Sequence, residues 1–346
     1  MRIGVAISGG MDSAASGLIL KKEGHELIAL HMRLFEDSAA STAKAQRVAN
    51  LIKAPLHVID LENDFQKTIL DHFAHEYNLG RTPSPCPRCN RLIKMTLLAD
   101  HARSLGCQKL ATGHYANIVH QQDIVTLTKG HDAVKDQSYF LFMLTPEQLK
   151  FTCFPLGSWK KSQVRSFLSS IDRELSESQE SQELCFIKND DYVSFLKKMG
   201  IQSEPGPILD SQGNILGHHN GIINYTVGQR RGLGVCGPAP RYVIRIDSQT
   251  NSVIIGTRDE TFSNGALVTD LNIIRRDLAF SNKCFQVKIR STSRPTTCKI
   301  TRMDQTRLEF VFAEPQSSVA PGQAAVFYLE DIVVMGGWID APKRSE

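Results

Sequence analysis

Apolar and polar positions alternate along the first half of the chain with two different periods. Short runs rich in Ile, Val and Leu are typical of buried strands, whereas apolar residues spaced three or four apart are typical of amphipathic helices. These patterns predict strands at 2–8, 25–32, 55–61 and 109–114, and helices at 12–24, 41–53, 64–78 and 90–105. Strands and helices that alternate in this order build a parallel sheet with helices on both faces. We therefore predict an α/β, Rossmann-like N-terminal domain over residues 1–200.

The pattern changes after about residue 205 to short strands separated by turn residues. Residues 206–217 and 241–257 each predict a hairpin around a turn of Asp, Ser, Gly or Asn. Beyond residue 263 at least four further strands follow and helical patterns are nearly absent, as in a small antiparallel barrel. We expect a small central β domain at 201–262 and a C-terminal antiparallel β-barrel at 263–346.

Composition narrows the class of protein without identifying it. With 346 residues, 41% of them hydrophobic and 22% charged, the chain is typical of globular proteins and not of disordered or fibrous ones. The net charge of +4 is compatible with a nucleic-acid partner but is too small to indicate one. No apolar run approaches the roughly 18 residues of a membrane span, and no signal-peptide pattern opens the chain. We expect a cytoplasmic monomer with no membrane partner and with its eight cysteines reduced.

The loop "AISGGMDSA" at 6–14 carries the first candidate chemistry. It lies between a predicted strand and a predicted helix, where glycines let the backbone approach a ligand and a helix N-terminus attracts anions. It has no lysine, unlike the P-loop of nucleotide triphosphatases. Asp12 offers either a ligand for Mg²⁺ or a helix cap. Capping explains one or two of the polar and glycine positions, whereas phosphate binding explains them all.

The sequence S-G-G-x-D-S at 8–13 resembles the hallmark of the PP-loop ATP pyrophosphatase superfamily, whose fold is of the HUP type. The resemblance implies that ATP is cleaved between its α and β phosphates and that a carbonyl oxygen of the substrate is adenylated. The loop would hold the pyrophosphate that leaves. The residues that would contact ATP are Ala6, Ile7, Ser8, Gly9, Gly10, Met11, Asp12 and Ser13.

The segment "TPSPCPRCNRLIKM" at 82–95 carries the second candidate chemistry. Apolar residues recur after Cys89 at helical spacing, so we expect Cys89 to open a helix. A thiol at that point meets the positive end of the helix dipole, with Arg88, Arg91 and Lys94 nearby in sequence. Such surroundings lower the pKa of a cysteine. We predict that Cys89 is a thiolate and therefore a nucleophile.

Six segments together resemble the tRNA-specific 2-thiouridylases. They are the segment at 82–95, "ATGHYA" (111–116), "KDQSYFL" (135–141), "SQELCFI" (181–187), "YTVGQRRGLG" (225–234) and "PGQAAVFY" (321–328), in order over nearly the whole chain. The resemblance implies ATP-dependent 2-thiolation of the wobble uridine of tRNA, through adenylation of uridine O2 and sulfur transfer from a cysteine persulfide. It implies ATP with Mg²⁺ as cofactors, and tRNA and a sulfur-relay donor protein as partners.

The same resemblance assigns roles to individual residues. Cys185 would carry the persulfide and Cys89 would be the partner nucleophile, leaving a disulfide that a reductant reopens. Met32 and Gly113 would join the ATP site. The residues beside the target base would be Ser84, Pro85 and Cys86, and those in contact with tRNA would be His114, Lys135, Asp136, Gln137, Arg290, Ser291 and Gln323.

Purely structural roles compete for several of these positions. His114 is alternatively a hydrogen-bonded core histidine at the end of a strand. Lys135 and Asp136 are alternatively a surface ion pair of little energetic value. Gln323 follows Pro-Gly and alternatively completes a turn.

Two positions depart from the family pattern. Cys86 stands where many members have an aspartate, and Ser291 stands where relatives often have an aromatic residue that stacks on RNA. Cys86, Cys89 and Cys185 also match three ligands of a 4Fe–4S cluster whose fourth iron binds sulfide, which is the alternative to the persulfide. A thioredoxin-like C-x-x-C is disfavoured because no strand directly precedes it, and structural zinc lacks a fourth ligand.

Two other functions fit parts of the sequence. A PP-loop synthetase that adenylates a small molecule would not need two β domains with basic residues such as Arg275 and Arg290. A redox or iron–sulfur module without ATP chemistry would tolerate the change of Asp12 to alanine. Adenylation of RNA predicts the opposite result for that change.

Overall fold

The computed structural model describes residues 1–35, 38–178, 184–187, 189, 191–235, 239–281 and 284–344. Most of the polar stretch at 176–183, which precedes Cys185, lies outside these residues. None of the helices described is both long enough and apolar enough to cross a lipid bilayer.

A five-stranded parallel sheet forms the centre of the N-terminal half. Its strands are β1 (Arg2–Ala6), β2 (Glu26–Arg33), β3 (Leu56–Asp60), β4 (Lys109–Ala111) and β7 (Thr152–Cys153), in the spatial order β3-β2-β1-β4-β7. The first four strands lie where the apolar runs predict them. The strand order reverses between β1 and β4, and open α/β sheets bind ligands beyond the carboxyl ends of the strands at such a point.

Helices cover both faces of this sheet, as predicted. Successive residues of β2 point to opposite faces of the sheet, and both faces are packed. Leu27 and Ala29 belong to one apolar cluster, and Ile28 and Leu30 belong to another. The helices of the N-terminal half, not all of which contact the sheet, are α1 (Met11–Lys22), α2 (Ser38–Leu51), α3 (Glu62–Phe65), η1 (Gln66–Leu70), α4 (Asp71–Asn78), α5 (Pro85–Cys89), η2 (Asn90–Leu98), α6 (Ala99–Ser104), η3 (Ser138–Leu141), α7 (Pro146–Phe151), α8 (Lys161–Ser169), α9 (Arg173–Glu177) and α10 (Tyr192–Lys198). The segments η1 and η2 are π-helical and continue the α-helices on either side.

A hairpin that the sequence pattern did not predict connects this half to the barrel. Its strands are β5 (Ala116–Gln121) and β6 (Ile124–Lys129). The outer end of β5 is exposed on both faces, so its sequence lacks a clear apolar alternation. Strand β6 pairs with barrel strand β17 at Thr128, and Arg275 donates to Thr126 Oγ1 at 2.9 Å. The eight-stranded sheet therefore combines two strands of the N-terminal half with the six strands of the barrel.

The C-terminal half consists of β structure, as predicted. The central sheet contains β8 (Gly206–Leu209), β9 (Ile215–His219), β10 (Tyr242–Asp247) and β11 (Ser252–Gly256), and both expected hairpins are confirmed. The short helical turns η4 (Ile222–Asn224), η5 (Asp259–Thr261) and α11 (Arg276–Ala279) lie in the connections. The barrel strands are β12 (Phe262–Ile273), β13 (Phe285–Lys288), β14 (Thr296–Met303), β15 (Leu308–Ser317), β16 (Ala324–Leu329) and β17 (Ile332–Lys343). Antiparallel pairing of β12 with β17 closes the barrel.

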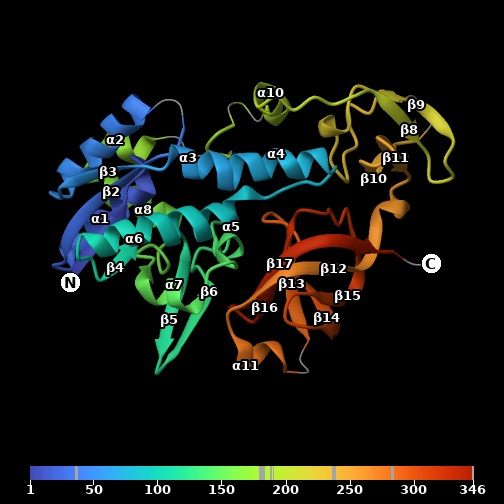
Figure 1. Cartoon of the computed structure of the whole chain (residues 1–346). Helices are drawn as coiled ribbons and strands as arrows, with labels where there is room; N and C mark the ends of the chain where they lie inside the picture. Colours follow the sequence, from blue (N-terminus) through green and yellow to red (C-terminus); the bar gives the residue numbers. More distant parts are fainter. Residues whose placement is uncertain are drawn as a thin grey trace.

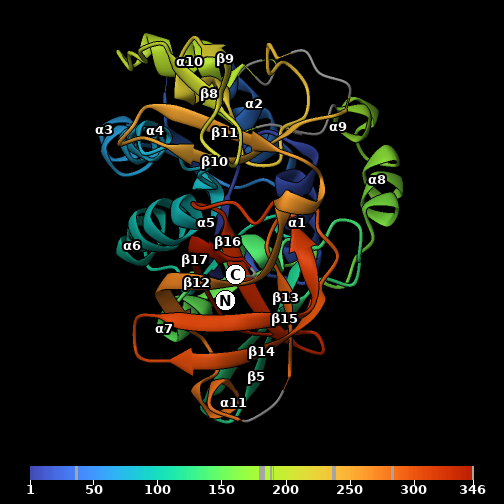
Figure 2. The same ribbon diagram turned by 90° about the vertical axis from the view of Figure 1, so that its right-hand side faces the viewer.

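The loop between α4 and α5 contacts both β regions. In Figure 1, α4 extends from the parallel sheet toward the central sheet, and the barrel lies beside α5; Figure 2 shows the central sheet and the barrel as separate bodies, one above the other. At the end of α4, a Cβ on Gly80 would lie 2.6 Å from Ile246 of the central sheet. Two residues later, Thr82 N donates to the Pro321 carbonyl of the barrel at 2.8 Å. This loop leads directly to Ser84 and the two cysteines.

Candidate active site

The glycine-rich loop begins α1 without any side-chain cap. Gly10 is the N-cap residue. Ser13 Oγ accepts a hydrogen bond from Ser8 N at 3.3 Å and donates to the Gly10 carbonyl at 2.9 Å. Gly9 has a φ of +83°, and a Cβ there would lie 2.5 Å from the Cβ of Lys44, so this position requires glycine. The loop thus presents the N-terminus of α1, with its positive dipole, to the space in front of it.

Asp12 is held by two residues from distant parts of the chain. Lys161 Nζ lies 2.8 Å from each carboxylate oxygen, and the Tyr115 hydroxyl donates to Oδ1 at 2.7 Å. Lys161 is the first residue of α8, and its side chain is only 13% exposed. Because α1 has no side-chain cap, capping is not the role of Asp12. The lysine that is missing from the loop is therefore supplied by another helix.

A cavity of about 800 Å³ opens in front of the loop. This volume lies within the range of roughly 300–1,000 Å³ that is typical of small-molecule sites. The cavity is lined by Ala6, Ile7, Ser8, Gly10, Met11, Asp12, Ser13, Met32 and Gly113 from the predicted ATP set. It lies where β1 and β4 end, at the reversal of strand order. The fold therefore brings nearly the whole predicted ATP set to one space.

The same cavity is strongly basic. The charged side chains that line it, within the described part of the chain, are those of Arg33, Lys44, Lys94, Lys135, Lys161 and Asp12. Asp12 is the one acid in this set. A cavity with this excess of positive charge attracts polyanions such as a triphosphate or an RNA backbone.

Cys86 and Cys89 lie in the first turns of a continuous helix formed by α5, η2 and α6. The helix begins at Pro85 with Ser84 as its N-cap residue. The prediction that Cys89 opens the helix is therefore wrong, because the fixed φ of a proline suits the first helical position. The π-helical segment η2 begins directly after Cys89, and π-helical turns are frequent at functional sites.

The environment of the thiols also contradicts the predicted thiolate. Cys89 is 9% exposed, and burial raises its pKa, with Lys94 acting in the opposite direction. Burial raises the pKa of Cys86 to about 11. Cys185 lines the cavity, and the protein around its thiol raises its pKa, as do the neighbouring Cys89 and Cys86. The three thiols are therefore neighbours that the fold keeps protonated near neutral pH.

These pKa directions predict how the RNA-free protein reacts with iodoacetamide. Below the pKa the thiolate fraction rises about tenfold per pH unit, so alkylation of Cys89 should rise steeply between about pH 7 and about pH 9. Lys94→Gln removes a cation that lowers the pKa of Cys89 and should slow the reaction at each pH, whereas Lys94→Arg should not. Peptide mass spectrometry measures both. A rate that stays constant from about pH 6 upward would indicate the thiolate inferred from the sequence.

His114 lies at the cavity in a neutral form. Its Nδ1 is 2.7 Å from Thr112 Oγ1, and its ring packs edge-on against Phe154 with 5.6 Å between ring centroids. Burial lowers its pKa well below the ordinary value. The residue lines the cavity as well, so it is a packed histidine with access to a ligand. Its contact with tRNA stays a prediction.

The three consecutive residues 135–137, which are predicted to contact tRNA, do not all face the cavity. Lys135 and Gln137 line the cavity, whereas Asp136 does not. Asp136 Oδ1 accepts from the backbone N–H groups of Gly130 and Ser138 at 2.9 and 3.1 Å. Its Oδ2 accepts from the Ser138 hydroxyl at 2.9 Å. Asp136 therefore shapes the loop that presents its two neighbours.

The predicted tRNA residues of the barrel lie outside the cavity. Arg290 Nη2 donates to the Ser317 carbonyl at 2.7 Å, while its Nε is buried without a hydrogen-bond partner in the described structure. The adjacent Ser291 is exposed. Gln323 Nε2 donates to the Thr82 carbonyl at 2.8 Å. Gln323 thus joins the barrel to the loop before Ser84, and the contacts of all three with tRNA stay predictions.

The side chains do not form a ready metal site. Within the described ranges, no group of three or more His, Cys, Asp or Glu residues could hold a metal ion. Cys86, Cys89 and Cys185 are neighbours, and a 4Fe–4S cluster held by these three thiols stays a prediction. Both oxygens of Asp12 are bonded to Lys161, so the residues present do not fit a Mg²⁺ ion without phosphate oxygens as its other ligands.

Several polar residues at the cavity carry no signal in the sequence that marks them as part of a site. They are His31, Lys44, Tyr115 and Lys161. Tyr115 lies inside the segment 111–116, directly after His114. Lys161 lies in no recognised segment, and a basic pair such as 160–161 at the start of a helix is common on protein surfaces. Only the tertiary structure brings this lysine to Asp12.

Fold and cavity together define a nucleotide-binding α/β protein with appended β regions. Three family models match the chain in succession: a tRNA methyl transferase HUP domain at 1–189, a tRNA methyl transferase PRC-barrel domain at 193–257 and an aminomethyltransferase beta-barrel domain at 263–339. The boundaries predicted at 200 and 262 remain a prediction.

Curated relatives identify the family. A tRNA-specific 2-thiouridylase MnmA of Geobacter metallireducens is 43% identical over 359 residues, covering 98% of this chain and 97% of that protein. A tRNA-specific 2-thiouridylase MnmA of Rickettsia typhi is 37% identical over 348 residues, covering 97% of each. The chain belongs to the tRNA-specific 2-thiouridylase family.

Solved structures show weaker similarity. A U34-tRNA thiolase NcsA from Methanococcus maripaludis, with its 4Fe-4S cluster, has a TM-score of 0.36 and 17% identity, covering 57% of this chain and 65% of that chain. At this level the similarity carries no inference about a cluster.

Proposed function

We propose that the protein uses ATP to replace O2 of the wobble uridine of tRNA with sulfur. The observation that supports this most is that the S-G-G-x-D-S loop and Cys185 line the same cavity. Activation of the base oxygen and delivery of sulfur both take place at C2 of one base. The nucleotide site and the thiol must therefore face a common space, so that the reacting groups are held close together.

The first step is adenylation of the base. Uridine O2 attacks the α-phosphorus of ATP, the bond to the β-phosphate breaks, and pyrophosphate leaves. The N-terminus of α1 and Lys161 face the space where the negative charge of the leaving group grows, and fixed charges placed there stabilise the transition state. The product carries AMP on O2, which is a far better leaving group than the original oxygen. We propose that Mg²⁺ enters with the phosphates of ATP.

The second step is sulfur transfer. Cys185 first receives a sulfane sulfur from a relay protein and becomes a persulfide. The terminal sulfur then bonds to C2, and AMP leaves with O2. Cys89 loses its proton to solvent and attacks the Cys185 sulfur as a thiolate, which breaks the persulfide bond. The sulfane sulfur gains two electrons, and the two thiols lose them to form a Cys89–Cys185 disulfide. A cellular thiol reductant reopens that disulfide.

The remaining predicted residues position the RNA. Ser84, Pro85 and Cys86 would lie beside the target base, and His114, Lys135 and Gln137 would contact nearby parts of the tRNA from the wall of the large cavity. Arg290, Ser291 and Gln323 would contact it from the barrel, and Asp136 would act through the loop that it shapes. A monomeric state and a cytoplasmic location complete the proposal.

Pyrophosphate release tests the proposed function. Purified protein with labelled ATP should release pyrophosphate only when the RNA carries the target uridine, and the same RNA with cytidine at that position serves as the control. A synthetase for a small molecule would instead leave pyrophosphate release independent of RNA. Absence of release with every RNA would refute adenylation. Anaerobic purification followed by iron and acid-labile sulfide assays decides between the persulfide and the 4Fe–4S cluster.

A further inference from the structure

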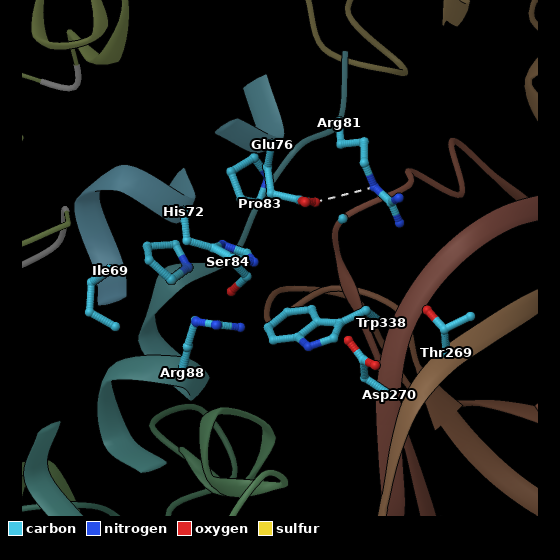
Figure 3. Close-up of a pocket in the computed structure, with 12 residues that line it drawn as sticks. Ile69, His72, Glu76, Arg81, Pro83, Ser84, Arg88, Thr269, Asp270 and Trp338 are labelled. Atoms are coloured by element: carbon cyan, nitrogen blue, oxygen red, sulfur yellow. Dashed lines mark ion pairs between the residues drawn. The ribbon is translucent and has the colours of Figure 1, made fainter. Parts of the chain in front are cut away.

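A second, smaller cavity lies between the α/β region and the barrel. Figure 3 shows it as a gap with side chains from both bodies pointing inward. Its volume is about 120 Å³. His72 of α4, Ser84 and Arg88 form one wall, and Asp270 and Trp338 of the barrel form the other.

Ion pairs and hydrogen bonds fix the position of one wall relative to the other. Arg81 pairs with Glu76 of its own body at 3.2 Å and with Asp340 of the barrel at 3.1 Å. The Gln323 amide and the Pro321 carbonyl both bond the backbone of Thr82, each at 2.8 Å. The cavity is therefore preformed in the RNA-free protein, so a ligand does not have to order it.

Arg88 and Asp270 face the cavity from opposite sides. Arg88 Nε donates to the Thr68 carbonyl at 3.1 Å, and this is the only side-chain hydrogen bond of Arg88 among the described residues. Asp270 has a φ of +50°, and the β12–β17 register shifts between Thr269 and Asn272. Such a bulge redirects a side chain, and here Asp270 points toward the gap. A ligand between the two could accept hydrogen bonds from Arg88 and donate one to Asp270.

The cavity favours a neutral, flat ligand over an anion. The charge of Arg81 is compensated by Glu76 and Asp340, and Arg88 lies opposite Asp270. Burial lowers the pKa of His72 to about 4, so its ring is neutral near neutral pH. The Trp338 indole is fixed by edge-on packing against Phe142, with 5.5 Å between centroids. A closed cavity of about 150 Å³ binds benzene, and this open one of about 120 Å³ is slightly smaller, so it admits at most one six-membered ring and excludes a purine.

The target uridine itself does not belong in this cavity. Its C2 must reach both the α-phosphate of ATP and the sulfur on Cys185, and these groups belong to the large cavity. None of Cys86, Cys89 and Cys185 lines the small one. Ser84 and Pro85, however, both line the small cavity and directly precede Cys86 at the start of α5. A nucleotide beside the target is therefore within reach of the small cavity.

We propose that the small cavity binds the pyrimidine base of a nucleotide that flanks the target uridine, unstacked from the RNA and placed on Trp338 between Arg88 and Asp270. This inference rests on the proposed function, because it takes RNA as the substrate. Binding of the neighbouring base would fix the RNA backbone next to α5 and so help to keep the target base in the large cavity. The cavity would thus contribute RNA affinity and positioning, and no chemistry.

Abasic RNA substrates test this inference. The probes are synthetic anticodon stem–loops with a uridine at the target position and an abasic ribose on either its 5′ or its 3′ side. One of the two should bind about 5- to 150-fold more weakly than the intact RNA, the range found for loss of one base stacked on an aromatic side chain. Trp338→Ala should weaken binding of the intact RNA by a similar factor and should abolish the difference between intact and abasic RNA. Trp338→Tyr keeps an aromatic ring at this position and should therefore largely restore the affinity for intact RNA.

Two further measurements exclude a merely structural effect. Trp159 and Trp338 are the two tryptophans of the chain, so Trp159→Phe leaves Trp338 as the single indole reporter, and its emission should be quenched by intact RNA but not by the sensitive abasic RNA. Phe280→Ala, at a barrel residue that is 63% exposed and outside both cavities, is the matched control. If neither abasic RNA binds more weakly and the emission does not respond, the inference is wrong. Thiolation of the intact RNA by the unmodified protein is measured in parallel. If the RNA is thiolated, the proposed function stands even when the inference about the small cavity fails. If it is not thiolated, the proposed function itself is contradicted.

Discussion

Replacing Cys185 by serine is expected to lower 2-thiouridine formation by more than about 10³-fold while RNA binding, ATP binding and pyrophosphate release persist. The hydroxyl that replaces the thiol cannot accept a sulfane sulfur, so the second step stops after the base has been adenylated. Cys185 lines the cavity from a segment remote in sequence from the S-G-G-x-D-S loop, and adenylation needs no thiol, so the first step should continue. Mass spectrometry of nucleosides from digested tRNA measures the product.

Variants of the other two cysteines separate the persulfide from the cluster. Cys89→Ser should also abolish the product, but with the persulfide retained on Cys185, where intact-protein mass spectrometry detects the additional sulfur. Cys86→Asp gives this position the residue that many family members carry and should retain thiolation, whereas a cluster bound by all three thiols would be lost. Complete thiolation by Cys185→Ser or by Cys89→Ser would remove the sulfur-transfer mechanism.

The part of the fold that the sequence predicts is the part fixed by local periodicity. Strands β1 to β4 and the helices between them follow from runs of apolar residues and from helical spacing, because each of these elements buries one or both faces along its own length. The hairpin β5–β6 could not be found in this way. Its position depends on pairing with β17 from the other end of the chain, and its exposed tip needs no apolar pattern.

The same distinction applies to the candidate site. The loop at 8–13 can be predicted from the sequence because its functional residues are consecutive, and in the structure these residues lie at the cavity. The pKa of Cys89 was predicted in the wrong direction because the sequence shows the nearby cations but not the burial that outweighs them. Lys161 was missed for a related reason: its partner Asp12 is adjacent in space and remote in sequence.

The ion pair between Asp12 and Lys161 leads to the second large effect. Lys161→Ala is expected to lower RNA-dependent pyrophosphate release by about 10²–10³-fold, the usual cost of removing one group that stabilises transition-state charge. RNA affinity should change little, because the effect belongs to the phosphates. Asp12→Ala should reduce release at least as much, because it removes the acid of the S-G-G-x-D-S loop. Release of labelled pyrophosphate under single-turnover conditions measures both.

A merely structural role for Lys161 predicts a different pattern, and a double-mutant cycle distinguishes the two. Removing one partner leaves the other charged and partly buried, since Lys161 is 13% and Asp12 is 32% exposed, so each single variant should unfold at a lower temperature than the double variant Asp12→Asn with Lys161→Met. If Lys161 only neutralises Asp12, the double variant should release pyrophosphate as fast as Asp12→Asn alone. If Lys161 acts on the phosphates, adding Lys161→Met to Asp12→Asn should cost about a further 10-fold or more although it restores stability. The cycle compares the unmodified protein, the two single variants and the double variant. If the rate of pyrophosphate release simply follows the unfolding temperature across these four proteins, Lys161 does not act on the phosphates, because a lysine that stabilises the leaving pyrophosphate must affect the rate independently of its contribution to the fold.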